Sequence, residues 1–138
     1  MARTNSRTNK GKNVNEMIQG NEVAAFAPVI GVVYNTDKVA KFNTALPTMN
    51  EDKGPLCFIA VTAFKGSFED EVIDQLDAVL ENVEEYDKKK HGDYKDYLAD
   101  CDHIQLSGHL VTNTWEDRKK NKHTNIEIVA DMIDIEEA

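Results

Sequence analysis

The chain has few of the features that mark membrane or secreted proteins. Among its 138 residues are only 2 cysteines, 3 prolines and a single tryptophan. No apolar run approaches the roughly 20 residues that a membrane-spanning helix needs. The first residues, MARTNSRTNKGKN, lack the apolar stretch of a signal peptide, so we expect a cytoplasmic protein without a membrane partner. The length suits one domain with its own core.

Residue patterns typical of catalysis or metal binding are also missing. Cys57, Cys101 and the 4 histidines show no zinc-ligand spacing. We expect two reduced thiols, Cys57 in a buried strand and Cys101 at a helix end. No Gly-rich phosphate loop and no nucleophile elbow is present. We therefore expect no enzyme, no metal and no cofactor.

Negative charge is in excess but is confined to one segment. The formal net charge is −9, and residues 67–102 hold thirteen acids against four lysines. The rest of the chain is balanced, with twelve charges of each sign. Residues 1–21 are polar, basic and without a hydrophobic period, which predicts a disordered arm. Because local fields guide a polyanion more than net charge does, nucleic-acid binding is not excluded.

Alternation with period two predicts three strands in the first half of the chain. The first covers 22–34 and contains Gly31, at which a strand commonly bulges or bends. The second covers 38–46 and the third 56–64. Between these two, residues 47–55 include two prolines and a glycine, which predicts a mobile loop.

Helical spacing replaces the alternation in the acidic segment (residues 67–102). Ser67 and Asp70 resemble a capping box at the start of a long helix. The basic run Lys88–Lys90 is expected to end this helix, and we interpret it as helix-end charge, not as a nucleic-acid site. A short second helix is predicted around Tyr94–Cys101.

The last part of the chain, residues 107–135, predicts a β-hairpin with a basic tip. On its rising strand Leu106 and Leu110 share one parity, whereas Trp115 shares the other with polar residues. Trp115 is therefore expected on the polar face, away from the core. Such a ring beside a basic group predicts a surface that stacks on flat, anionic nucleic acid. The basic group is Arg118, Lys119, Lys120 and Lys122.

The third predicted strand has apolar residues of both parities. Cys57, Ile59 and Val61 form one face, and Phe58 and Phe64 belong to the other. This strand is either buried on both sides or presents its aromatic residues outward.

Three strands, a helical segment and two more strands are the order of an OB-fold barrel, although alternation alone also fits an open α+β sheet. We predict a mostly β, five-stranded OB-fold barrel over residues 22–138. Its helical segment, at about 67–102, lies between the third and fourth strands and is enlarged.

Several segments resemble the bacterial and phage single-stranded DNA-binding protein family. SGHLVTNTWED, a basic turn and TNIEIVADMIDI are similar to its fourth and fifth strands. PVIGVV, KVAKFNTAL and FIAVTAFKG resemble the first three. The resemblance implies an OB fold that binds single-stranded DNA with little sequence preference in replication, recombination or repair. It also implies a homodimer or homotetramer, with the first strand as a contact.

The resemblance further implies that Trp115, Phe58 and Phe64 stack on bases. Lys41, Lys65 and the four basic residues of the hairpin tip would then follow the phosphates. Two features depart from the family. The region that often holds a further tryptophan offers only Met49, and the acidic tail is absent, which argues against partner recruitment through that tail.

Other interpretations remain open. Phe58 and Phe64 could equally be core or subunit-interface residues, and Trp115 could be a rim residue that packs on the helix. The lysines could belong to a solvated turn. An OB-fold protein-interaction module that engages a replication partner through its acidic helical segment is the alternative function. RNA binding by the same face is a third.

Overall fold

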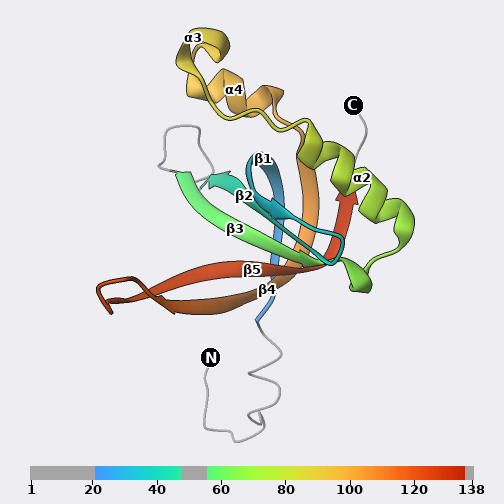
Figure 1. The fold of residues 1–138 in the computed structure, drawn as a ribbon. Helices are drawn as coiled ribbons and strands as arrows, with labels where there is room; N and C mark the ends of the chain where they lie inside the picture. Colours follow the sequence, from blue (N-terminus) through green and yellow to red (C-terminus); the bar gives the residue numbers. More distant parts are fainter. Residues whose placement is uncertain (1–20, 48–55, 136–138) are drawn as a thin grey trace, which may run out of the picture.

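The computed structural model describes residues 21–47 and 56–135 (Figure 1). The predicted basic arm, apart from its last residue, and nearly all of the predicted mobile loop, Met49 included, lie outside the described residues. Five strands make up most of the described chain. They are β1 (Val23–Asn35), β2 (Val39–Pro47), β3 (Leu56–Phe64), β4 (His103–Glu116) and β5 (Lys122–Ile135).

The strands form a closed barrel in the order β1-β2-β3-β5-β4. β3 and β5 run parallel, and the other neighbouring pairs are antiparallel. This arrangement confirms the predicted five-stranded OB fold and excludes the open sheet. The β4–β5 hairpin extends well beyond the barrel, whereas the helices gather at its other side (Figure 1).

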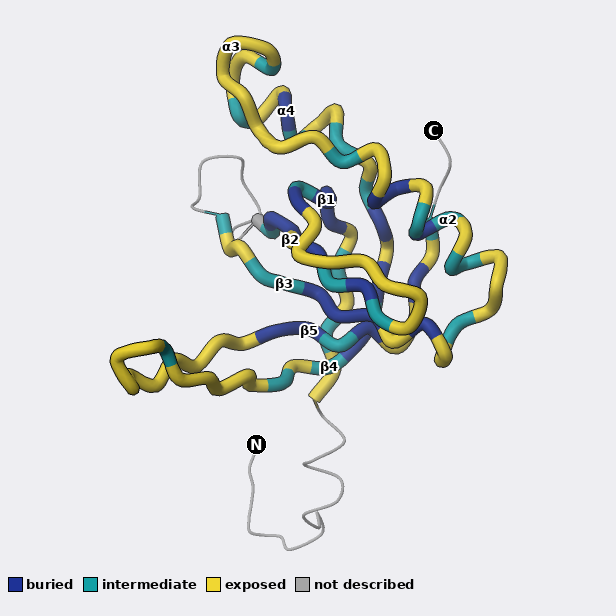
Figure 2. The backbone as a smooth tube through the Cα atoms, in the orientation of Figure 1, coloured by how far each residue is buried: buried dark blue, intermediate teal, exposed yellow. Residues whose placement is uncertain are grey.

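Alternate strand residues fill the interior of the barrel. Phe42, Val61 and Ile104 are fully buried there, at 0% exposure, and Leu76 of the first long helix closes the core at 1%. Figure 2 shows that the buried residues lie on the barrel strands and on the inner side of this helix. Because strand side chains alternate, each inward residue fixes an outward neighbour.

Cys57 is exposed, although the sequence predicts it in a buried strand. It has the parity of the core residues, but it pairs with Leu46 near the end of the β2–β3 ladder. At that end the inward face of β3 has passed beyond the buried core. Cys57 and the half-buried Cys101 are both free cysteines.

The helical segment is present between β3 and β4, but it is divided differently from the prediction. After a short turn, η1 (Lys65–Ser67), helix α2 (Asp70–Glu81) ends seven residues before the lysines that were expected to close it. The apolar spacing continues to Val83, which packs on the core from a non-helical segment. Spacing alone therefore overestimates the length of the helix.

The basic run lies in a separate short helix, α3 (Lys88–His91), and the predicted second helix is α4 (Tyr94–Asp100). The carboxylate of Asp87 accepts a hydrogen bond from the backbone N–H of Lys89 and so caps α3. The interpretation of Lys88–Lys90 as the charged end of a long helix is therefore wrong. No helix among the described residues is long and apolar enough to cross a membrane.

Helix α2 is held by packing and an ion pair instead of the predicted capping box. Its N-cap is Glu69, whose side chain makes no capping hydrogen bond, and Ser67 belongs to η1. The amino group of Lys65 lies 2.8 Å from the Asp77 carboxylate. Asn35 of β1 donates a hydrogen bond to the same carboxylate, so α2 is tied to the barrel at two points.

The β4–β5 ladder contains a bulge at which two backbones come very close. The register shifts between Ser107 and Gly108, and a Cβ atom at Gly108 would lie 2.0 Å from the carbonyl oxygen of Val129. No side chain fits there. β1 shifts register at Gly31, as predicted, but a Cβ atom there would lie an ordinary 3.7 Å from its nearest neighbour, the Asn43 side chain.

We predict that Gly108→Ala lowers the free energy of unfolding by more than about 2 kcal/mol, because the added methyl group meets backbone that cannot move aside. Gly31→Ala is the matched control, with an expected change below about 1 kcal/mol. Urea titrations followed by circular dichroism measure both. Equal stability of the two variants would contradict the close approach at Gly108.

Candidate nucleic-acid interface

Phe58 and Phe64 lie on the outer face of β3. Their side chains alternate with the buried Val61 and Ala63, and their exposed fractions are 62% and 49%. Of the two possibilities that the sequence leaves open, β3 therefore presents its aromatic residues outward. The two rings stand near opposite ends of one strand face, six residues apart.

Trp115 lies close to the tip of the hairpin, where β4 pairs with β5. Its ring is 47% exposed and stacks on His123, with centroids 4.4 Å apart and planes inclined by 21°. His123 is the residue opposite Trp115 in the ladder. Trp115 therefore lies on the polar face, as predicted. Among the described residues its ring stacks on this histidine and not on a helix.

The side chain of Asp117 organises the turn next to Trp115. Its carboxylate accepts hydrogen bonds from the backbone N–H groups of Lys119 and Asn121 and lies 2.9 Å from His123 Nε2. The hydrogen bond to His123, with those from the backbone, holds the pKa of Asp117 below its usual value. The tip is thereby fixed around an ionised carboxylate, which orients the imidazole against Trp115.

A cluster around Glu127 joins the outer faces of four strands. One carboxylate oxygen accepts hydrogen bonds from Lys41 of β2, at 2.9 Å, and Asn113 of β4, at 3.0 Å. The other accepts one from Thr62 of β3, at 3.3 Å. Asn113 has the same parity as Trp115, and Thr62 the same as Phe58 and Phe64. The three aromatic rings therefore share one continuous outer face.

Glu127 is 6% exposed, which is unusual for a carboxylate on an outer face. Burial would raise its pKa, but the hydrogen bonds from Lys41, Asn113 and Thr62 outweigh burial and hold the pKa below its usual value. The group is therefore ionised at neutral pH and forms a buried ion pair with Lys41.

Lys41 and Lys65 are engaged within the protein. Lys41 pairs with Glu127, and Lys65 is 6% exposed and pairs with Asp77 on the side of the barrel that α2 covers. Both were predicted to follow phosphates. Because each cation already has a carboxylate partner, the geometry argues against direct phosphate contacts by either one.

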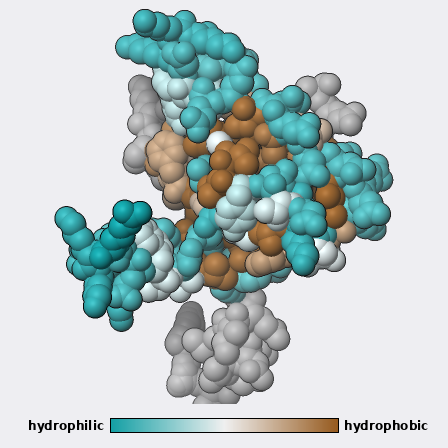
Figure 3. All heavy atoms as spheres, viewed as in Figure 1, coloured by the Kyte–Doolittle hydropathy of each residue, from teal (hydrophilic) through white to brown (hydrophobic). Residues whose placement is uncertain are grey.

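The basic group at the hairpin tip is exposed to solvent, and no ion pair is formed by it in the described part of the chain. Lys120 has a left-handed backbone conformation with φ of 65°, which few residues other than glycine favour. Figure 3 shows apolar side chains over the barrel between the hydrophilic tip and the hydrophilic lobe of α3 and α4. The basic group at the hairpin tip consists of Arg118, Lys119, Lys120 and Lys122.

Two ring residues that contact the predicted aromatic side chains were themselves not predicted. His123 could have been found by counting across the hairpin from Trp115, since the two positions are symmetric about the turn. Tyr94 contacts the edge of Phe58, with ring centroids 6.5 Å apart, but the two lie in different elements far apart in the chain. No local pattern indicates that contact.

Together, the fold and these exposed rings define a five-stranded OB-fold protein with an aromatic outer face. Among solved structures, the small single-stranded DNA-binding protein of Streptomyces coelicolor is similar, with a TM-score of 0.51 and 15% identity over 85% of this chain and 95% of that one. The mitochondrial single-stranded DNA-binding protein Rim1 of S. cerevisiae has a TM-score of 0.47 and 11% identity over 83% and 92%. No family model and no curated protein matches the sequence. The Streptomyces structure shows a shared fold.

We predict that Glu127→Gln lowers the free energy of unfolding at neutral pH by about 2 kcal/mol, because the charge-assisted hydrogen bond to Lys41 is lost. The lowered pKa makes this stabilisation complete above the unfolded value near 4.5, and it is lost as the pH falls below that. Urea titrations at neutral and acidic pH should show the difference between wild type and variant shrinking in acid.

The control is Glu116→Gln, at the exposed end of β4, for which we expect little change at either pH. A stability difference for Glu127→Gln that stays constant from neutral to acidic pH would contradict the ionised pair.

Proposed function

We propose that this protein binds single-stranded DNA with little sequence preference. Bases stack on Trp115, Phe58 and Phe64, and the hairpin tip contacts phosphates. The observation that carries the proposal is the placement of three exposed rings on one face of an OB barrel. Stacking contributes about 1–3 kcal/mol per base and tolerates every base, because each has a π-face.

The distribution of free positive charge supports the same ligand. The tip cations stand beside Trp115 without carboxylate partners among the described side chains, so they are free to displace counterions from a phosphate backbone. The excess negative charge belongs to residues 67–102, and helix α2 of that segment lies across the barrel from the extended hairpin (Figure 1). The local field at the tip therefore favours a polyanion despite the net charge of −9.

We further propose that the protein protects single strands during replication, recombination or repair in the cytoplasm, associated with the nucleoid, without enzymatic activity. The names of the two similar structures give single-stranded DNA as what those proteins bind. A homodimer or homotetramer fits the apolar side chains that β1 and β5 leave in solvent. Phe26 is 58% exposed and Met132 68%.

A protein-interaction role is the second candidate, because α2 presents the exposed acids Asp70, Glu71 and Asp74 to solvent. Retention of a basic replication protein on the immobilised chain, with no retention of oligo-dT, would favour this role. Competition between matched DNA and RNA oligomers tests whether the stacking face also accepts RNA.

We predict that Trp115→Ala weakens binding of oligo-dT about tenfold or more while leaving the fold intact, because one stacking platform is lost from a half-exposed site. Trp115→Phe should retain most of the affinity. In the wild type, oligo-dT should quench Trp115 emission strongly, and the quenching should weaken as salt rises.

Absence of quenching at low salt would end the proposal of DNA binding.

We predict that Lys120→Gly reduces the dependence of log affinity on log salt by about 0.7, the value for one phosphate contact on a single strand. Its stability should not fall, because glycine adopts the left-handed φ of 65° without steric cost. Lys38→Gln, in the β1–β2 turn, is the control and should leave the salt dependence unchanged. A salt dependence equal to that of the wild type would remove Lys120 from the site.

A further inference from the structure

We propose that the α3–α4 lobe extends the path of single-stranded DNA beyond the barrel. Phe58, Tyr94 and Tyr86 form an aromatic ridge on which further bases stack, and Lys88 and Lys89 of α3 contact the phosphates there. This inference rests on the proposed DNA binding and adds a second stretch to that site, contributed by the enlarged segment between β3 and β4.

The three rings of the aromatic ridge contact one another in sequence from the barrel to the lobe. Phe58 and Tyr94 meet edge to face, with centroids 6.5 Å apart, and Tyr94 and Tyr86 meet edge to face at 4.8 Å. The ridge is open at both ends, because Phe58 is 62% exposed and Tyr86 36%. A single DNA strand that stacks on Phe58 therefore continues over aromatic surface if it runs toward α3.

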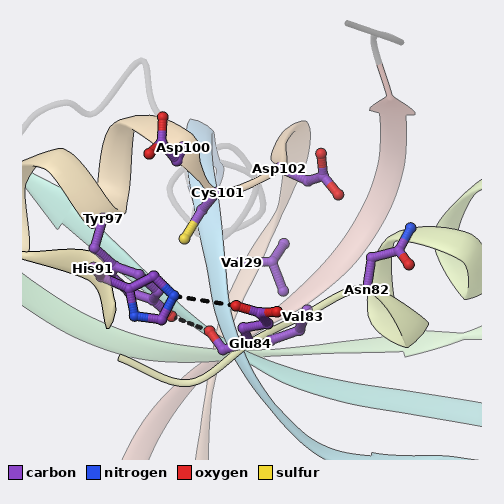
Figure 4. A pocket seen from close by; sticks show the side chains of 9 residues that line it. All are labelled: Val29, Asn82, Val83, Glu84, His91, Tyr97, Asp100, Cys101 and Asp102. Atoms are coloured by element: carbon purple, nitrogen blue, oxygen red, sulfur yellow. Dashed lines mark hydrogen bonds and ion pairs between the residues drawn. The ribbon is translucent and has the colours of Figure 1, made fainter. Parts of the chain in front are cut away.

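The lobe is fixed to the barrel by polar contacts. The hydroxyl of the buried Tyr97 donates to the backbone carbonyls of Ile30 in β1 and Glu84. Figure 4 shows His91 and Tyr97 side by side above Glu84, with His91 Nε2 3.1 Å from its carboxylate. The hydroxyl of Tyr86 donates to the carbonyl of Gly92. Such a preorganised surface loses little entropy when a strand stacks on it.

Charge beside the ridge is more favourable to phosphate than the composition of the segment suggests. Glu84 is already paired with Lys90 and His91, and Asp87 caps α3. The amino groups of Lys88 and Lys89 are exposed and form no ion pair within the described part of the molecule. Two exposed cations therefore follow Tyr86 in the chain by two and three residues, where phosphates would follow the stacked bases.

Titrations with two lengths of oligo-dT test the inference, one of about 6 nucleotides and one of about 16, the range that an OB fold covers. Tyr86→Leu keeps an apolar side chain but removes the aromatic face. We expect it to weaken binding of the long oligomer about tenfold and to leave the short one nearly unchanged, because the short one remains between Phe64 and Trp115. Tyr86→Phe keeps the ring and should bind as the wild type does.

The double variant Lys88→Gln with Lys89→Gln tests the phosphate contacts without touching the aromatic ridge. We expect the salt dependence of long-oligomer binding to fall by about 1.4, twice the value for one contact. Lys38→Gln is the matched control for an exposed cation elsewhere and should leave length and salt dependence unchanged.

Quenching of Trp115 fluorescence distinguishes failure of the proposed DNA binding from failure of the proposed extension. If the wild type shows no quenching, the proposed DNA binding and this extension both fall. If the wild type binds but Tyr86→Leu and the double lysine variant match it on the long oligomer, the extension alone is overturned. If the Tyr86→Leu chain does not fold, the double lysine variant decides, and an unchanged salt dependence on the long oligomer overturns the extension.

Discussion

A single buried carboxylate aligns the outer faces of four strands. Glu127 accepts hydrogen bonds from Lys41, Thr62 and Asn113, each on a different strand, and it is ionised because those bonds outweigh the cost of burial. Loss of a partner would leave this buried charge uncompensated, so the cluster favours the register in which all three partners reach it. The shared face of the aromatic rings follows from that register.

Pairing with carboxylates also determines which positive charges remain available to a ligand. Lys41 is held by Glu127 because the closed barrel brings the two together, and Lys65 is held by Asp77 of the docked helix α2. The cations of the hairpin tip, and Lys88 and Lys89 of α3, are exposed. Asp117 lies among the tip cations, but its carboxylate is used by the turn and by His123. Despite its acidic composition, the chain therefore leaves two groups of cations exposed, at the hairpin tip and on α3.

Strand positions, the polar face of Trp115 and the shared face of Phe58 and Phe64 could be predicted, because alternation is a local property of the backbone. Alternation did not decide whether that face of β3 points outward. β3 begins and ends at the predicted residues, and the polar neighbours of Trp115 correctly indicated its face. Helix α2 was predicted too long because Val83 continues the apolar spacing from outside the helix. The exposure of Cys57 depends on where the barrel core ends, which parity does not report.

The sequence by itself determined the order of the elements, the polar face of Trp115 and the shared face of Phe58 and Phe64, since these depend on neighbours one or two residues away. Only the tertiary structure decided that Lys41 meets Glu127, 86 residues further along the chain, and that Tyr94 meets Phe58. The physical reason is that ion pairs and ring contacts act over a few ångströms between side chains. Closure of the barrel and docking of the helices, not spacing along the chain, bring those side chains together.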